Sequence, residues 1–376
     1  MPSIKSILLL TFGLLSPGLV SAQTWTQTSA PTKYWNAVAS SADGSKLVAV
    51  TYNGGIYTST NYGKTWISNS VPNLQWESVA SSADGNRLVA VPFNTVPYTS
   101  TNSGATWVTN TAFANDWHLV ASSADGTKLF GAGNVGRLAT STNAGTTWTT
   151  NTAPIDSWYS VAASADASKL VAANGQTVYT STNFGATWKT NSTAWSRPAF
   201  SISSSTDASQ LVVASVQGGG VFTSTDFGAT WKSNSVPHTQ WVSTGSSADG
   251  TQLIAAGTYI YTSTNSGAGW VSNNVAQGWQ AVACSADGDR LVAVVYGGGI
   301  WTAQRQPKPL VNLSLAAANA KVGWIVPSTN FVLQQSIDLT SWTDVTNLPV
   351  FNPTNVQNEI ILPHTNTSGF YRLKTP

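Results

Sequence analysis

The chain has 376 residues, of which 41% are hydrophobic and only 9% charged, and its formal net charge is +2. So small a charge, without a basic cluster, gives no electrostatic footprint for nucleic acid. This composition, with many small polar residues and tryptophans, favours an exported β-rich protein over a cytosolic α/β enzyme. A single cysteine, Cys284, excludes an internal disulfide.

Residues 1–22 have the pattern of a secretory signal peptide. Lys5 supplies a positive start, Ile7 to Leu15 are apolar, and Val20-Ser21-Ala22 forms a small-residue cleavage site. No segment reaches the ~20 consecutive apolar residues that a transmembrane helix needs. We therefore expect a secreted chain, extracellular or periplasmic, with retention at the cell surface left open.

Residues 23–303 contain seven copies of one unit. Its fullest form is W-x-x-V-A-S-S-A-D-G-x-x-L-V-A-V, a Gly-rich turn, and then I-Y-T-S-T-N-x-G-x-T-W. A period of about 40 residues indicates a propeller or a solenoid. One turn aspartate marks each unit: Asp43, Asp84, Asp125, Asp166, Asp207, Asp249 and Asp287.

Each unit carries the signals of four short strands. In the first unit these cover residues 35–41, 46–52, 55–61 and 64–70, separated by turns that contain Asn, Asp and Gly. The second strand is apolar on both faces, which requires cover on both sides, as between two neighbouring blades. The sequence therefore predicts an all-β, seven-bladed propeller with four-stranded blades.

The seventh unit lacks its fourth strand, because the repeat ends after Gly299-Ile300-Trp301. Trp25 precedes Trp66 by the same interval at which Trp66 precedes Trp107. We expect the N-terminal strand to complete the seventh blade and leave no open sheet edge.

The segment Ser59 to Trp66, STNYGKTW, recurs in five further units and matches the Asp-box pattern S-x-D/N-x-G-x-T-W. The chain thus resembles the BNR/Asp-box propellers of bacteria, a superfamily that includes sialidases, sortilin-like receptors, xyloglucan-active glycosidases and photosystem assembly factors. The resemblance implies the fold, whereas the functions of these proteins diverge. Asn or Asp can cap a turn, so we interpret the box residues as structural. They are Asn61, Asn102, Asn143, Asn183, Asp226 and Asn265.

In the enzymes that the chain resembles, the active site lies on the rim away from the boxes. The loops that lead into each first strand reach this rim. A tryptophan recurs at the start of six first strands, for which we favour packing between blades over sugar stacking. The next position varies in charge and shape, and we predict a ligand-binding ring there; an unconstrained exposed position is the alternative. The ring comprises Asn36, Glu77, His118, Tyr159, Phe200 and Gln280, with Val242 in the sixth unit.

The enzyme alternatives use the same rim. An absent Arg-Ile-Pro segment argues against sialidase activity. A glycoside hydrolase needs two carboxylates, for which Glu77 and Asp116 are available. A polysaccharide lyase could use His118 and Tyr159 for proton transfer, with Arg137 or Arg197 neutralising a uronate. The three dispersed histidines predict no metal site, and nothing predicts a cofactor. We prefer a monomeric binding module for an extracellular glycan or protein, with a polysaccharide-active lyase or hydrolase as the alternative.

The repeat ends in a linker, residues 304–309, before a C-terminal β domain over residues 310–376. Strands are predicted at 312–318, 331–338, 341–345, 358–363 and 369–374, as in a small β-sandwich. The pattern F-V-L-Q-Q-S-x-D-L-x-x-W-x-x-V, with a final G-F-Y-R-L, resembles a C-terminal module of exported proteins from Verrucomicrobia-like bacteria. Surface retention and passive stabilisation both remain open as its role.

Overall fold

The structure is a computed structural model. It describes residues 23–110, 117–133, 136–175, 177–191, 199–216, 219–237, 240–273 and 275–305, and in the C-terminal part residues 311–316, 319–325, 332–336, 341–346, 350–352, 357–363 and 370–374. The predicted signal peptide and the predicted linker from residue 306 lie outside these ranges. Contacts between Cα atoms divide the chain into two compact units, with the division between Arg305 and Gln306.

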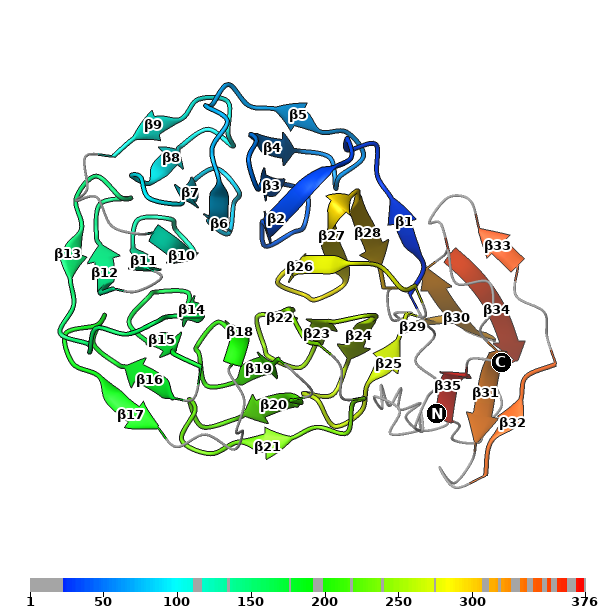
Figure 1. Cartoon of the computed structure of the whole chain (residues 1–376). Helices are drawn as coiled ribbons and strands as arrows, with labels where there is room; N and C mark the ends of the chain where they lie inside the picture. Colours follow the sequence, from blue (N-terminus) through cyan, green and yellow to red (C-terminus); the bar gives the residue numbers. More distant parts are fainter. Residues whose placement is uncertain are drawn as a thin grey trace. The chain divides into compact units, whose positions relative to one another are not determined.

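The first unit is a seven-bladed β-propeller, and its described residues contain no helix. Seven antiparallel blades surround a central channel, with the second strand of each blade buried between its neighbours (Figure 1). This confirms the predicted fold class.

The strands run outward from the channel in chain order within each blade. Blades 1 and 2 contain β2 (Lys33–Ser40), β3 (Leu47–Thr51), β4 (Ile56–Ser59), β5 (Ile67–Ser68), β6 (Trp76–Ser81), β7 (Leu88–Pro92), β8 (Tyr98–Ser100) and β9 (Val108–Thr109). Blades 3 and 4 contain β10 (Trp117–Ser122), β11 (Leu129–Gly133), β12 (Leu138–Ser141), β13 (Thr149–Thr150), β14 (Ser160–Ala163), β15 (Leu170–Ala173), β16 (Val178–Ser181) and β17 (Lys189–Asn191). Blades 5 and 6 contain β18 (Ala199–Ser204), β19 (Leu211–Ser215), β20 (Val221–Ser224), β21 (Lys232–Ser233), β22 (Ser243–Ser246), β23 (Leu253–Ala256), β24 (Ile260–Ser263) and β25 (Val271–Ser272).

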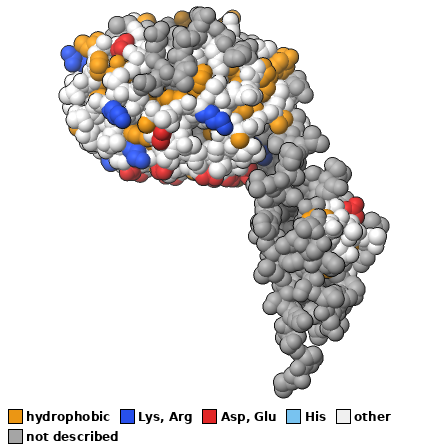
Figure 2. Space-filling model, turned by 90° about the horizontal axis from the view of Figure 1, so that it is seen from below, with side chains coloured by type: hydrophobic (Ala, Val, Ile, Leu, Met, Phe, Trp, Pro, Cys, Tyr) orange, Lys and Arg blue, Asp and Glu red, His pale blue; other side chains and the backbone are white. Residues whose placement is uncertain are grey.

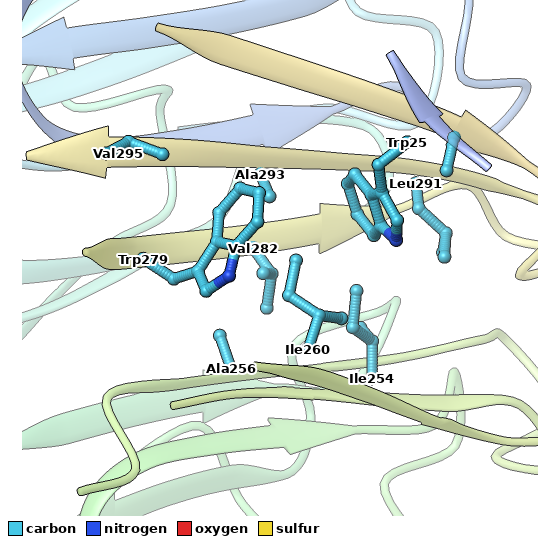
Figure 3. Packing of buried hydrophobic residues seen from close by; sticks show 10 residues of the cluster. Trp25, Ile254, Ala256, Ile260, Trp279, Val282, Leu291, Ala293 and Val295 are labelled. Carbon is cyan, nitrogen blue, oxygen red and sulfur yellow. The ribbon is translucent and has the colours of Figure 1, made fainter. Parts of the chain in front are cut away.

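Blade 7 is closed by the N-terminal strand. It contains β26 (Trp279–Cys284), β27 (Arg290–Gly298), β28 (Ile300–Gln304) and β1 (Trp25–Gln27). β1 pairs antiparallel with β28, with Trp25 opposite Ala303. Trp25 also packs against Trp279, with ring centroids 5.8 Å apart, in an apolar cluster that includes Ile260 of blade 6 (Figure 3). The N-terminal strand therefore anchors the closing blade through both hydrogen bonds and core packing.

The fourth strands are shorter than predicted. Residues 64–70 were expected to form a strand, but β5 spans Ile67–Ser68 only, and both of its residues are exposed. A strand at the circumference has one neighbour and little apolar surface to bury, so side-chain packing stabilises it weakly. β28, in turn, continues to Gln304, one residue past the predicted end of the repeat.

Backbone hydrogen bonds also join the seven units in a ring around the channel. In each unit the N–H of the residue before the turn aspartate donates to the carbonyl of its counterpart in the next unit, at 2.7 Å, and the last bond returns to the first unit. We call this circle the turn ring. Its members are Ala42, Ala83, Ala124, Ala165, Thr206, Ala248 and Ala286.

The second unit consists of two antiparallel sheets. One contains β29 (Val311–Ala316), β30 (Asn319–Ile325), β34 (Gln357–Pro363) and β33 (Val350–Asn352). The other contains β32 (Thr343–Asp344), β31 (Val332–Ser336) and β35 (Phe370–Lys374). β30 and β33 were not predicted. Val322, Leu333 and Ile360 are buried, so both sheets contribute to an apolar interior.

Candidate functional site at the channel mouth

The turns and boxes form one rim of the propeller, and their polar groups are bonded to each other. In the first box, the Asn61 side-chain oxygen accepts the N–H of Thr65 at 2.9 Å, and Ser59 Oγ accepts the N–H of Gly63 at 2.9 Å. The same two bonds recur in the other five boxes. These groups serve local backbone geometry, which leaves them poorly suited to recognising a ligand.

The turn aspartates make this rim acidic. Figure 2, which shows the propeller edge-on, has acidic side chains along one rim. A hydrogen bond from the Ser41 hydroxyl, joined by bonds from Ser45, lowers the pKa of Asp43 to about 2. The equivalent serine lowers the pKa of Asp125, Asp166 and Asp207 to about 2 as well. Because their ionised forms are stabilised, these carboxylates stay charged at any physiological pH.

The opposite rim carries the predicted ligand-binding ring. In five blades the ring residue is left out of the pairing between the first and second strands. The pairing of the first and second strands skips one residue in five blades. A β-bulge of this kind leaves one residue without a partner on the neighbouring strand and re-aims its side chain. The skipped residues are Asn36, Glu77, His118, Phe200 and Gln280.

A signal for these bulges was present in the sequence. The tryptophan and the valine of the W-x-x-V segment are three residues apart, yet Trp76 and Val79 are both buried. In a regular strand, residues an odd number of positions apart point to opposite faces. Trp76 and Val79 lie in the same apolar cluster, so their odd spacing requires an irregularity between them, and sequence reasoning did not use this.

Four ring residues form a hydrogen-bonded chain across four blades. Gln280 Nε2 donates to Asn36 Oδ1 at 3.1 Å, and Asn36 Nδ2 donates to the Trp76 carbonyl at 2.9 Å and to Glu77 Oε2 at 3.4 Å. His118 Nδ1 lies 3.4 Å from Glu77 Oε2. The structure thus brings together predicted site residues from blades 7, 1, 2 and 3.

Glu77 is the centre of this chain. Its side chain is 10% exposed, against 32% for His118, and Gln75 Nε2 donates to its other oxygen at 2.6 Å. Burial alone would raise the pKa of Glu77, but the hydrogen bonds from His118, Gln75 and Asn36 outweigh it, and the pKa lies below its ordinary value. The carboxylate is therefore held ionised.

The next two blades contribute an aromatic pair. Tyr159 and Phe200 are 37% and 43% exposed, and their ring centroids are 6.0 Å apart. Val242, in blade 6, is partly buried. Tyr159 and Val242 precede strands β14 and β22, and each donates its N–H to the second strand, to Ala173 and Ala256 respectively. The channel mouth is therefore polar on one side and aromatic on the other.

Of the residues of the enzyme alternatives, the described structure brings Glu77 and His118 together, 3.4 Å apart. Asp116 and Arg197 lie outside the described residues. Arg137 is described and exposed. His118 contacts Glu77, whereas Tyr159 contacts Phe200. The described residues contain no group of His, Cys, Asp and Glu side chains arranged to hold a metal ion.

The first-strand tryptophans are core residues. Trp35, Trp76, Trp117, Trp158, Trp241 and Trp279 are at most 3% exposed. Trp76 and Trp158 also donate their indole N–H to backbone carbonyls, at 2.8 and 3.0 Å. Packing between blades, and not sugar stacking, accounts for them.

A second aromatic group lies on the same rim between blades 7 and 1. The Tyr34 and Tyr296 rings are 5.1 Å apart and 58% and 47% exposed, and Tyr52 lies 6.4 Å from Tyr296. Sequence reasoning did not bring these three residues together. The reason is that their grouping depends on the contact between Tyr34 of β2 and Tyr296 of β27, strands of different blades.

No protein-family model and no curated protein matches the sequence. Solved structures do match in three dimensions. One is described as YCF48 bound to D1 peptide, with a TM-score of 0.60 and 14% identity over 76% of this chain and 97% of that chain. Another is YCF48 from Cyanidioschyzon merolae, with a TM-score of 0.62 and 15% identity over 76% of this chain and 99% of that one. This chain shares their β-propeller fold. No long apolar helix that could cross a membrane occurs among the described residues.

Proposed function

We propose that the propeller is a binding module that takes an extended protein segment across the channel mouth. The observation that carries this proposal is the row of bulge residues, in which Gln280, Asn36, Glu77 and His118 form one hydrogen-bonded chain beside the Tyr159–Phe200 pair. Backbone amides of a bound segment can bond with the amide side chains, and an apolar side chain can pack on the exposed rings.

Preorganisation supports this proposal. The polar side chains are already fixed by one another, so less rotamer entropy is lost when a ligand binds. A propeller of the same fold, YCF48, is described as bound to D1 peptide. Export through residues 1–22 remains part of the proposal, which places the partner outside the cytoplasm.

The Glu77 environment argues against Glu77 as the general acid of a glycoside hydrolase. A general acid in a glycoside hydrolase needs a raised pKa, so that it still carries a proton near neutral pH. The pKa of Glu77 is lowered instead, and both of its oxygens accept hydrogen bonds. The geometry therefore suits Glu77 to hold its neighbours in place.

The experiment is a selection of peptides from a displayed random library on the immobilised full chain, followed by anisotropy titration of a labelled selected peptide. We expect Tyr159→Ala and Glu77→Gln to weaken binding at least tenfold, because both remove contacts at the mouth. Ile67→Ala is the matched control, since Ile67 is 65% exposed on β5 at the circumference. Equal binding by all three variants would exclude the channel mouth.

A glycan ligand is the second candidate, favoured by the exposed Tyr34 and Tyr296 rings, which can stack on a sugar. Affinity electrophoresis against neutral and uronate-containing polysaccharides tests it, with Tyr34→Ala as the variant. Retardation that disappears in Tyr34→Ala would favour the glycan over the peptide. Release of reducing or unsaturated ends in the same mixtures would restore the enzyme alternative.

A further inference from the structure

A cavity of about 520 Å³ lies at the junction between blades 7 and 1, on the rim of the turns. Corresponding cavities of about 360 Å³ and 290 Å³ lie between blades 3 and 4 and between blades 4 and 5, whereas the cavity between blades 2 and 3 measures about 10 Å³. In that smallest cavity Arg87 corresponds to Arg290, and Ala144 to Tyr62. We call the cavity between blades 7 and 1 the closure groove.

Blade 7 has no box loop at the closure groove. In blade 2 the box loop connects β8 to β9. In blade 7, β28 ends at Gln304 and the fourth strand arrives from the N-terminal side, so no box loop joins them. Thr24 and Gln304 line the groove at the positions where Thr106 ends and Thr101 begins that loop in blade 2.

The lining combines an apolar floor with hydroxyl groups. Leu47 and Leu291 are buried at its base. The side chains of Thr24, Thr26 and Thr302 also face the cavity. Its volume falls within the range of about 300–1,000 Å³ that is typical of small-molecule sites.

Two cations give the groove its charge. Arg290 and Lys64 line it, and the described residues that line it include no carboxylate. The Arg290 guanidinium stacks 4.0 Å from the centroid of the Tyr62 ring, and its Nη1 donates to Gln304 Oε1 at 3.4 Å. Stacking fixes the plane of the guanidinium, which reduces the entropy lost when its remaining N–H groups bind an anion.

We propose that the closure groove binds a small hydroxylated carboxylate, an acidic sugar unit of the hexuronate class. The carboxylate pairs with Arg290 and Lys64, the sugar hydroxyls bond with the threonine hydroxyls, and the apolar face of the sugar ring lies on the leucine floor. This site lies on the rim of the turns, so it is independent of the channel mouth and of the function proposed there.

The test uses D-galacturonate and D-galactose, which differ only in the C6 carboxylate, with saturation-transfer NMR on the full chain. We expect saturable binding of galacturonate and at least tenfold weaker binding of galactose. Arg290→Gln should weaken galacturonate binding about tenfold or more, because it removes a charge-assisted hydrogen bond. Arg87→Gln, the equivalent change in the closed cavity, should leave binding unchanged.

Further variants separate a binding role from a structural one. Lys64→Gln changes an exposed side chain and should weaken galacturonate binding severalfold while the melting temperature stays the same. Tyr159→Ala, at the channel mouth, should leave galacturonate binding intact. The proposal is overturned by absent galacturonate binding, by equal binding of galactose, or by Arg290→Gln and Arg87→Gln behaving alike.

Discussion

The two rims of the propeller are built by the same strands, yet the polar side chains on the two rims have different hydrogen-bond partners. On the rim of the turns, the serine hydroxyl to aspartate distance stays between 2.5 and 2.7 Å in blades 1 to 6. At the channel mouth, the equivalent positions carry an amide, a carboxylate, an imidazole or an aromatic ring, and they bond across blades. The positions that repeat in each blade thus form hydrogen bonds within one unit. The positions that vary between blades carry side chains that lie outside the regular pairing of the strands.

Two adjacent residues, Trp76 and Glu77, give the strongest test of the difference between packing positions and channel-mouth positions. Trp76 is fully buried and Glu77 faces the mouth, although they are neighbours on β6. We expect Trp76→Ala to reduce the free energy of unfolding by about 3–5 kcal/mol, because it leaves a large cavity between blades. Urea unfolding measures the change. Glu77→Gln should have a much smaller effect on unfolding, and a larger loss for Glu77→Gln than for Trp76→Ala would invert the roles assigned to the two positions.

A smaller effect is expected at the turn glycines. Gly126 has a φ of +70°, and a Cβ there would lie 2.6 Å from Arg87 Cβ of the preceding blade. Gly126→Ala should therefore cost about 1–3 kcal/mol of unfolding free energy. The matched variant is Ala167→Gly, because the equivalent turn of blade 4 already holds Ala167 at a φ of 55°. That change should leave thermal stability nearly the same, and an equal loss in both variants would disprove a local steric cause.

The smallest effect concerns a single turn carboxylate. The pKa of Asp125 is lowered to about 2 from an ordinary value of 3.8 by the Ser123 hydroxyl and by Thr127. A carboxyl whose pKa is lower in the folded state stabilises the protein above its unfolded pKa, and this contribution disappears as the pH falls from about 4 to 2. Asp125→Asn should cost about 1 kcal/mol at pH 7.

Thermal melts of wild type and Asp125→Asn at pH 7 and pH 2 check the sign of this effect. The gap between the two melting temperatures should narrow at pH 2, because about half of the wild-type carboxyl is then protonated in the folded state. A gap of the same size at both pH values would show that charge at this turn does not contribute to stability.

Much of the propeller could be predicted because the same strand and turn patterns occur in each of the seven units. Trp25 revealed the closure of blade 7 through its spacing alone, and the structure pairs its strand with β28. The pairing of Tyr34 with Tyr296 escaped prediction because it depends on two strands from opposite ends of the repeat. The C-terminal strands β30 and β33 were missed because the C-terminal domain has no repeat against which to compare them. In addition, apolar and polar residues alternate only weakly in NAKVGWI, the sequence of β30.

The candidate site was predicted as a set of positions and not as a set of contacts. Glu77 and His118 were singled out because they vary within a fixed frame, but the bulge that exposes them and the bond between them follow from register and twist. The closure groove could not be foreseen, since Arg290 and Tyr62 belong to the last and first units and meet only when the ring closes.

The turn ring has a consequence for how the propeller opens. Because its seven amides donate in one direction around the channel and the last returns to the first unit, no member is terminal. A linear array of repeats unfolds first at its ends, but the closed turn ring has no end at which unfolding can begin. The amide protons of Ala42 and its six counterparts should exchange with solvent deuterium as one slow group, at the rate of global opening, while those of the outer strands exchange by local fluctuation.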